Sequence, residues 1–377
     1  MAPLVSQLAH TAGIESIVCT TGQHRSMLQQ VMDLFEIKAD YDLEVMTANQ
    51  TLNGLSRLLL ERLDPVLDAV KPDRILVHGD TTTAMISALA AFHRGIPVGH
   101  VEAGLRTGNM SQPWPEEMNR RVVDVVSDLM FAPTAQSKSN LLAENLGGRI
   151  ITTGNTVIDA LRMVVSRLLN DELMRRSVDA SLPRLDPGRK LLLVTGHRRE
   201  NFGDGFDAIC EALGTLALRN DIEIVYPVHL NPNVQGPVHA TLGGLPRIHL
   251  IEPVDYLGFV RLMQRAHVIL TDSGGVQEEA PSLGKPVLVM REVTERPEAL
   301  AAGAVQLVGT SKVKIVEAVT QLFEEPELCQ HYSQVRNPYG DGNACSRIIA
   351  SLLQKDVQEF SPTRDTATAR CQDALVA

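Results

Sequence analysis

Short apolar runs alternate with amphipathic stretches along almost the whole of this 377-residue chain. Each apolar run ends in turn-forming or polar residues, and the longer segments between the runs have helical spacing. Such alternation is typical of βαβ units, in which helices connect parallel strands. We therefore expect an α/β fold with strands at 16–20, 74–78, 97–101, 129–132, 150–152, 190–195, 222–226, 248–251, 267–271, 286–290 and 304–308, and helices that include 52–70, 82–94 and 255–264.

The alternation pauses between residues 161 and 189, where a helical stretch is followed by Pro183, Pro187 and Gly188. Clustered proline and glycine favour a connecting segment, so we predict two doubly wound, Rossmann-like domains on either side of it. The polar tail has the composition of a disordered segment. The predicted boundaries are 1–170 for the first domain, 171–189 for the linker, 190–340 for the second domain, 341–354 for a last helix and 355–377 for the disordered tail.

The charge and cysteine content exclude several classes of protein. The formal net charge of −10 argues against general binding to nucleic acids or membrane surfaces, although a local pocket can still bind an anion. The five cysteines are odd in number and include no C-x-x-C pair, which indicates free thiols rather than a disulfide framework or a zinc site. No apolar run approaches the roughly 20 residues of a membrane span, so we expect a cytoplasmic protein.

Acidic residues follow two neighbouring strands of the first predicted domain. Asp80 comes after the run at 74–78, and Glu102 comes after the run at 97–101. Ligands bind beyond the carboxyl ends of parallel strands, so the two carboxylates are candidates for a shared site. The simpler interpretations are that Asp80 caps the following helix and that Glu102 is a solvated loop acid.

A third acid, Glu116, opens the helix that follows Trp114-Pro115. Arg120 is four residues further on, so both side chains share one face of that helix. An ordinary surface ion pair explains this spacing equally well. If Glu116 instead converges with Asp80 and Glu102, the site holds several carboxylates for acid and base catalysis.

Two strand ends of the second domain have the features of an anion site. After the strand at 267–271 comes Asp272-Ser273-Gly274-Gly275, whose glycines and helix-start amides suit a phosphate, and Glu279 follows on the same helix. After the strand at 190–195 comes Gly196-His197-Arg198-Arg199, whose charges suit a diphosphate. The chain contains neither a G-x-G-x-x-G after a strand nor a G-x-x-x-x-G-K-[ST] motif, so a classical NAD fold and a P-loop NTPase are not supported.

Taken together, these junctions resemble those of the bacterial non-hydrolysing UDP-N-acetylglucosamine 2-epimerases. The similarity extends from Met1 to about residue 353 and lies in five motifs: His78-Gly79-Asp80-Thr81, Val101-Glu102-Ala103-Gly104-Leu105-Arg106, Trp114-Pro115-Glu116-Glu117, Gly196-His197-Arg198-Arg199-Glu200 and Asp272-Ser273-Gly274-Gly275-Val276-Gln277-Glu278-Glu279. The resemblance implies a glycosyltransferase-B type fold with the active site in the interdomain cleft. It also implies a homodimer without a cofactor or metal that interconverts UDP-GlcNAc and UDP-ManNAc.

The resemblance further assigns roles to individual residues. It makes Asp80, Glu102 and Glu116 the catalytic carboxylates and places His197 at the departing diphosphate. The remaining implied substrate contacts are Arg120, the phosphate-binding Ser273, Gly274 and Gly275, the ribose-binding Glu279, Phe259 against uracil, Arg296 at the nucleotide, and Val254 where some relatives have Gln. Some relatives have a second, activating UDP-GlcNAc site, which Gln23, His24 and Gln50 match in part, although Asn49 replaces a basic residue.

Relatives also carry a strand and an Arg- and Lys-containing loop before the helix that matches Met1–Val5. The printed chain begins at that helix. We therefore expect its first domain to lack one central strand and two cations, and we expect poor solubility or low activity from it.

The chemistry of the substrate favours one mechanism. The C2 proton of the sugar is not next to a carbonyl, so we expect anti elimination of UDP to 2-acetamidoglucal and re-addition to the opposite face, within cell-surface polysaccharide synthesis. The alternatives are a glycosyltransferase of the same fold with UDP-GlcNAc as donor, and an inactive nucleotide-sugar-binding paralogue. UDP-GlcNAc supplied alone separates these alternatives, because only an epimerase then forms UDP-ManNAc.

Overall fold

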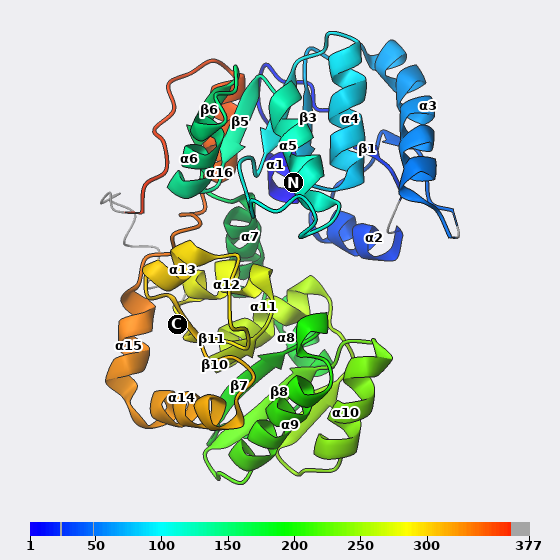
Figure 1. Ribbon diagram of the computed structural model, residues 1–377. Coiled ribbons are helices and arrows are strands. Elements are labelled where there is room, and N and C mark those ends of the chain that lie inside the picture. The colour runs from blue at the N-terminus through cyan, green and yellow to red at the C-terminus, as the bar shows by residue number, and fades with distance from the viewer. Residues whose placement is uncertain (23–24, 48, 363–377) are drawn as a thin grey trace. The chain divides into compact units, whose positions relative to one another are not determined.

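The computed structural model describes residues 1–22, 25–47 and 49–362 of the chain. It contains two compact units, each built on parallel strands. Unit 1 comprises residues 1–160 and 339–361, and unit 2 includes residues 161–338 (Figure 1). None of the described helices has both the length and the apolar composition that a membrane crossing requires.

The strands of unit 1 form two separate parallel sheets. β1 pairs with β2, and the other four strands follow the order β3-β4-β5-β6. Among the described residues, β1 and β3 therefore each have a strand neighbour on one side only. The bounds of the six strands are β1 Cys19–Thr20, β2 Tyr41–Asp42, β3 Ile75–His78, β4 Val98–Val101, β5 Leu129–Ala132 and β6 Arg149–Thr152.

Helices cover both faces of the four-stranded sheet of unit 1. Leu4 and Ile348 pack with Val101 and Phe131 on one side, whereas Ala88 and Val123 pack with Val98 on the other. The helices of this unit are α1 Ala2–Leu8, α2 Arg25–Leu34, α3 Leu52–Val70, α4 Thr82–His93, α5 Glu116–Val126, α6 Ala135–Ala143 and α16 Ala344–Leu352. Helix α7, Thr156–Asn170, begins in unit 1 and continues into unit 2.

Unit 2 has the doubly wound sheet that the alternation of its sequence predicts. Its order is β12-β11-β10-β7-β8-β9, so the chain builds outward from β7 in one direction and from β10 in the other. Ligands of such sheets bind where this order reverses, which here is between the ends of β7 and β10. The strands are β7 Lys190–Thr195, β8 Ile222–Pro227, β9 Ile248–Ile251, β10 Ala266–Thr271, β11 Val287–Val289 and β12 Val305–Leu307.

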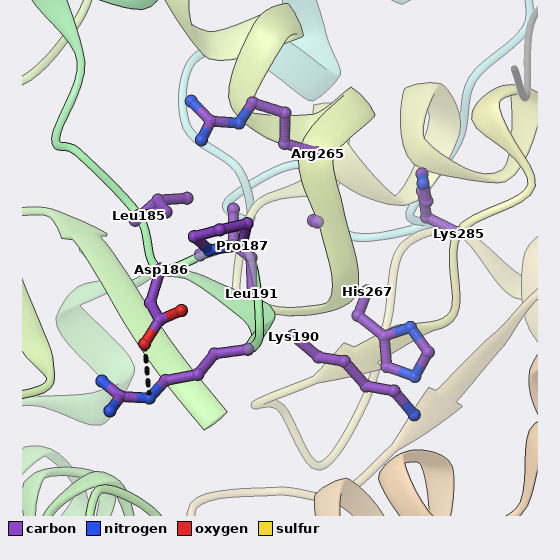
Figure 2. Close-up of a pocket in the computed structure, with 10 residues that line it drawn as sticks. Leu185, Asp186, Pro187, Lys190, Leu191, Arg265, His267 and Lys285 are labelled. Atoms are coloured by element: carbon purple, nitrogen blue, oxygen red, sulfur yellow. Dashed lines mark ion pairs between the residues drawn. The ribbon is translucent and has the colours of Figure 1, made fainter. Parts of the chain in front are cut away.

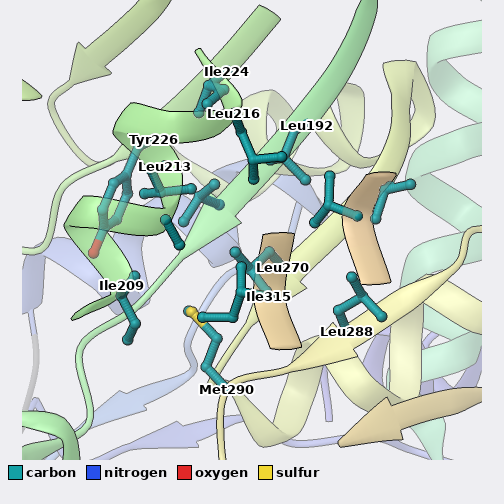
Figure 3. Packing of buried hydrophobic residues seen from close by; sticks show 14 of the residues in the cluster. Leu192, Ile209, Leu213, Leu216, Ile224, Tyr226, Leu270, Leu288, Met290 and Ile315 are labelled. Carbon is teal, nitrogen blue, oxygen red and sulfur yellow. The ribbon is translucent and has the colours of Figure 1, made fainter. Parts of the chain in front are cut away.

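The core of unit 2 is largely aliphatic and lies between its sheet and the helices α9, α10, α14 and α15. Leu192 of β7 and Leu270 of β10 face Leu213 of α9 and Ile315 of α14 in one buried cluster (Figure 3). The helical segments of this unit are α8 Glu172–Ser181, η1 Arg199–Asn201, α9 Asp204–Leu216, α10 Pro232–Leu242, α11 Tyr256–Arg265, α12 Gly274–Glu279, η2 Ala280–Leu283, α13 Pro297–Ala301, α14 Lys312–Glu324 and α15 Pro326–Gln334.

Most predicted elements lie within one or two residues of the observed ones. The two-residue strand β2 was not predicted, because so short a run has no periodicity. The helical stretch expected before Pro183 includes α8, which packs against α11, but the units divide near residue 160 instead of 170.

The predicted disorder of the tail is wrong for residues 355–362, whereas residues 363–377 lie outside the described part of the chain. Glu359 accepts hydrogen bonds from the Lys138 ammonium at 2.8 Å and from the Thr152 amide at 3.1 Å. The Phe360 side chain is buried, with 7% of its surface exposed. These contacts offset the conformational entropy that the segment loses when it becomes ordered. Composition alone does not reveal them.

We predict that Leu192→Ala lowers the free energy of unfolding of unit 2 by about 2 to 5 kcal/mol, because it leaves a cavity in the cluster of Figure 3. Urea unfolding of the full chain measures this change. Leu218→Ala is the matched control, since Leu218 is 76% exposed and its truncation should change stability by no more than about 0.5 kcal/mol. Equal losses in both variants would contradict the assignment of this core.

Candidate active site

Asp80 lies just beyond the end of β3 and is held by helix α5. Its carboxylate forms an ion pair with Arg120, and its backbone carbonyl accepts a hydrogen bond from Asn119 Nδ2 at 2.9 Å. The cap of α4 is Thr81, whose hydroxyl accepts from the Ala84 amide at 3.1 Å. The capping explanation for Asp80 is therefore wrong, and its carboxylate pairs with Arg120 instead.

Glu102 lies at the neighbouring strand end, next to the same turn. β3 and β4 pair so that His78 lies opposite Val101, which brings Glu102 beside Gly79. A Cβ at Gly79 would lie 3.3 Å from Glu102 Oε2, so the glycine leaves room for this approach. Glu102 has a φ of 70°, a left-handed conformation that is uncommon for residues with a side chain and that often marks functional positions.

The Glu102 carboxylate contacts a histidine and an amide. Its Oε2 lies 3.7 Å from His78 Nε2, and its Oε1 accepts a hydrogen bond from Asn155 Nδ2 at 3.2 Å. Burial, the amino-terminal charge and His100 together lower the pKa of His78 well below its usual value. His78 is therefore a neutral neighbour of Glu102 rather than a compensating cation at neutral pH.

Glu116 is the first residue of α5 and is half-buried. In the part of the chain that the structure describes, no hydrogen bond or ion pair is formed by its carboxylate. Arg120, on the same helix, pairs with Asp80 and with Glu117 instead of Glu116. The simple surface pair between Glu116 and Arg120 is therefore absent, and the Glu116 carboxylate is free to contact a ligand.

Glu117, next in the sequence, is fully buried and has several donors. It accepts hydrogen bonds from the amides of Thr107 and Gly108 and from Arg120 and Arg121. Burial raises the pKa of Glu117, but these hydrogen bonds and cations outweigh burial and lower its pKa overall. No role was predicted for Glu117 from the sequence, although its spacing of three residues from Arg120 places both on one face of α5.

In unit 2, a buried carboxylate joins the loops that follow β7 and β10. Asp272 Oδ2 accepts hydrogen bonds from the backbone amides of His197 at 2.9 Å and Arg198 at 2.8 Å. Thr195 and Thr271, the last residues of the two strands, share a hydrogen bond of 2.6 Å between their hydroxyls. The structure therefore brings the two predicted phosphate loops together at the point where the strand order reverses.

Two guanidinium groups lie over the start of α12. A Cβ at Gly274 would be 3.8 Å from Arg198 Nη2 and 3.8 Å from Arg296 Nη2. Arg296 is held there by an ion pair with Glu278, and the buried Nε of Arg198 has no hydrogen-bond partner among the described residues. The first amides of a helix also lack intrahelical acceptors, so cations and amide donors meet at this point.

His197 lies beside this group of donors. Its ring stacks on His229 at a centroid distance of 5.5 Å, and its Nδ1 is 3.3 Å from Asp272 Oδ1. Burial lowers the pKa of His197 and outweighs the opposing effect of Asp272, while Arg198 and His229 add to the lowering. A bound diphosphate would act against this shift, because a nearby anion favours the imidazolium.

Glu279 is buried near the same site, and Tyr256 of α11 donates a hydrogen bond to it. Burial raises the pKa of Glu279 to about 7, with a further raise from Glu278, and the bond from Tyr256 only partly offsets it. Tyr256 was not identified from the sequence, because nothing in the spacing of residues 256 and 279 links them.

The remaining predicted residues lie around these elements. Phe259 of α11 is half-buried, and Val254 lies just before Asp255, the N-cap of α11. Gln50 donates to the Val45 carbonyl at 2.8 Å, whereas Gln23 and His24 lie outside the described residues. Among the described residues, this bond to Val45 does not connect Gln50 with the carboxylates of unit 1, and its allosteric role stays a prediction.

A hollow of about 440 Å³ lies at the opposite edge of the unit 2 sheet, lined in part by Lys190 and Ala266 at the starts of β7 and β10 (Figure 2). Its cations have local structural partners. Lys190 donates to the Phe323 carbonyl at 3.0 Å, and Arg189 lies 3.4 Å from Asp186. This hollow is therefore separate from the residues that follow the strand ends.

Comparisons with known proteins agree with this arrangement. The family model described as UDP-N-acetylglucosamine 2-epimerase matches residues 6–353. A UDP-N-acetylglucosamine 2-epimerase of Escherichia coli K12 is 55% identical over 354 residues, which are 93% of this chain and 94% of the relative. The crystal structure of UDP-GlcNAc 2-epimerase from Neisseria meningitidis bound to UDP-GlcNAc has a TM-score of 0.86 and 50% identity, covering 94% of this chain and 96% of that one. A glycotransferase of kitacinnamycin, 14% identical with a TM-score of 0.61 over 94% of each chain, shares the fold alone.

We predict that Glu279→Gln changes the pH dependence of stability. In the wild type, the pKa of Glu279 is about 7 in the folded state and 4.5 in the unfolded state, so the folded state binds this proton more tightly. The free energy of unfolding therefore falls as the pH rises from 4.5 to 7. Glutamine cannot ionise, so the variant lacks this fall. Its free energy of unfolding, relative to that of the wild type, should rise by about 2 to 3 kcal/mol from pH 5 to pH 8. Urea unfolding across this range measures the gain.

Tyr256→Phe provides the second arm of this measurement. The bond from Tyr256 lowers the pKa of Glu279, so its removal should make the loss of stability with rising pH larger than in the wild type. A difference between Glu279→Gln and wild type that stays constant with pH would show that Glu279 is not buried as described.

Proposed function

The chain belongs to the UDP-N-acetylglucosamine 2-epimerase family and is an enzyme of that activity, and we propose that it acts by elimination and re-addition of UDP. In this reaction a carboxylate of unit 1 removes the C2 proton of the sugar. The C1–O bond to UDP breaks, its electron pair leaves with the diphosphate, and a C1=C2 double bond forms. UDP then adds back to C1 while C2 receives a proton on the opposite face.

The chemistry of the C2 proton supports this proposal. No carbonyl is adjacent to C2, so a carbanion at C2 would have no internal stabilisation. Departure of UDP avoids such a carbanion, because the electron pair of the C2–H bond forms the C1=C2 double bond. The reaction requires a proton acceptor on one face of the sugar and a proton donor on the other. Asp80 and Glu102 lie at neighbouring strand ends beside one turn, and Glu116 opens the helix that holds Asp80, so unit 1 offers three carboxyl groups for these tasks.

The loops of unit 2 have the groups that a departing diphosphate requires. Arg198 and Arg296 converge on Gly274, where the first amides of α12 also point outward. Fixed donors and cations at such a point stabilise negative charge as it develops on the leaving group. We propose that Ser273, Gly274 and Gly275 bind the phosphates and that His197 contacts the departing oxygen.

The nucleoside contacts follow from the same placement. Glu279 lies on α12 beyond the phosphate-binding amides, where its carboxyl group can accept hydrogen bonds from ribose hydroxyls. Tyr256 already donates to one of its oxygens, which leaves the other oxygen for the ribose. We propose that Phe259 packs on uracil, with Val254 and Arg296 beside the nucleotide.

A glycosyltransferase of the same fold is the main competing function. Such an enzyme transfers the sugar to an acceptor and needs one general base, whereas unit 1 holds two acids at adjacent strand ends and a third at the start of α5. The sequence identity of 55% is also to curated 2-epimerases. We therefore favour the epimerase, whose product we propose supplies cell-surface polysaccharide synthesis.

We predict that UDP-ManNAc formed in D2O carries deuterium at C2, because the proton removed by the enzyme exchanges with solvent before re-addition. Mass spectrometry and proton NMR of the product measure the label. Product that retains its original C2 hydrogen would overturn the elimination mechanism.

Variants of the same assay test the carboxylates. Glu102→Gln should slow turnover by about 100- to 10,000-fold, which is the usual contribution of a general acid or base. Glu61→Gln is the control, because Glu61 is an exposed residue of α3 whose ion pair with Arg57 lies on the surface.

A further inference from the structure

Helix α5 buries an unusually polar face. Glu117, Asn119, Arg120 and Asp124 all lie on this one helix, and each is at least 92% buried, with exposures of 0%, 1%, 8% and 0%. Burying charged and polar side chains costs free energy unless each one is paired. The partners of these four residues therefore indicate what the face does.

Two of the four residues contact Asp80 directly, and a third acts through one of them. Asn119 donates to the Asp80 carbonyl at 2.9 Å, and Arg120 pairs with the Asp80 carboxylate. Glu117 in turn binds Arg120 at 3.3 Å, which fixes the guanidinium from its other side. Backbone and side chain of Asp80 are thus both held by one helix.

The fourth residue reaches the same turn through a histidine. Asp124 Oδ1 lies 2.6 Å from His100 Nδ1, and His100 Nε2 lies 3.0 Å from the carbonyl oxygen of Gly79, the residue before Asp80. Arg106 balances the second oxygen of Asp124 at 2.8 Å and is itself held by Glu144 at 2.6 Å.

Asn119 shows that stability alone is a poor explanation for this face. Its Oδ1 is buried with no hydrogen-bond partner among the described residues, which carries a desolvation cost. Buried ion pairs, moreover, often add little stability relative to apolar side chains of similar size. What all four residues share is that they hold the Gly79–Asp80 turn in position, directly or through a partner.

We propose that Asn119, Glu117 and Asp124 are positioning residues for epimerisation, which hold the Asp80 carboxylate in place against the sugar. The inference rests on the proposed catalytic role of Asp80. Asn119 acts on the Asp80 carbonyl, Glu117 acts through Arg120, and Asp124 acts through His100 and the Gly79 carbonyl.

Asn119→Leu tests this role in the full-length enzyme. Leucine has nearly the same size, removes the unsatisfied oxygen and abolishes the bond to Asp80. We expect kcat to fall by at least about ten-fold, since small misplacements of catalytic groups have effects of this size or larger. KM should stay within about three-fold of wild type, because the lost interaction aligns the reacting group and does not bind the nucleotide.

Val123→Ala is the matched control on the same helix. Val123 is fully buried in the apolar cluster of α4, α5 and β4, so its truncation lowers the melting temperature without touching Asp80. We expect this control to keep kcat within about two-fold of wild type at temperatures well below melting, despite a greater loss of stability than Asn119→Leu. Asp124→Asn is a second test variant that keeps the shape of the side chain, and its kcat should also fall.

A second readout separates alignment from stability. A misplaced Asp80 makes proton transfer at C2 less efficient, so Asn119→Leu should release more free UDP, together with 2-acetamidoglucal, for each UDP-ManNAc formed than the wild type does. Normal kcat and normal UDP release in both Asn119→Leu and Asp124→Asn would overturn the proposal, as would an equal fall of kcat in Val123→Ala. The elimination mechanism itself is tested separately, with the wild-type enzyme. It fails if UDP-ManNAc formed by the wild type in D2O keeps the C2 hydrogen of the substrate.

Discussion

The parallel arrangement of the strands is the constraint on which the rest of this structure depends. All strands of a parallel sheet end at the same edge, so residues that are far apart in the sequence meet there. Asp80 and Glu102 follow adjacent strand ends because β3 and β4 are neighbours, and the loops of His197 and Asp272 meet because β7 and β10 are neighbours. In unit 1 this edge collects carboxylates, whereas in unit 2 it collects guanidinium groups and helix-start amides.

Pairing of buried charge then fixes the side chains at each edge. Asp272 is fully buried and satisfies two backbone amides across the loops of unit 2. Glu117 does the same for the amides of Thr107 and Gly108 in unit 1. Carboxylates inside the protein therefore shape the loops, and the ion pair with Glu278 holds Arg296 beside Gly274.

The sequence predicts the strand ends well because apolar runs and the residues after them are local features. It therefore places Asp80, Glu102 and the Ser273 loop just after strand ends, as the structure has them. It does not identify the partners of these residues, because the bond from Asn119 to Asp80 spans 39 positions and that from Tyr256 to Glu279 spans 23. The ordered part of the tail escapes prediction for the same reason, since Glu359 finds its partner 221 positions earlier, at Lys138.

The division of tasks between the two units is the central claim, and hydrogen–deuterium exchange in the presence of UDP alone tests it most directly. UDP lacks the sugar, so it should occupy only the groups assigned to the nucleotide. We expect UDP to slow exchange in peptides that cover residues 272–279 and 196–202 and to leave peptides around Asp80 and Glu102 unchanged. Protection of the Asp80 and Glu102 peptides, with none in the two loops of unit 2, would contradict the account.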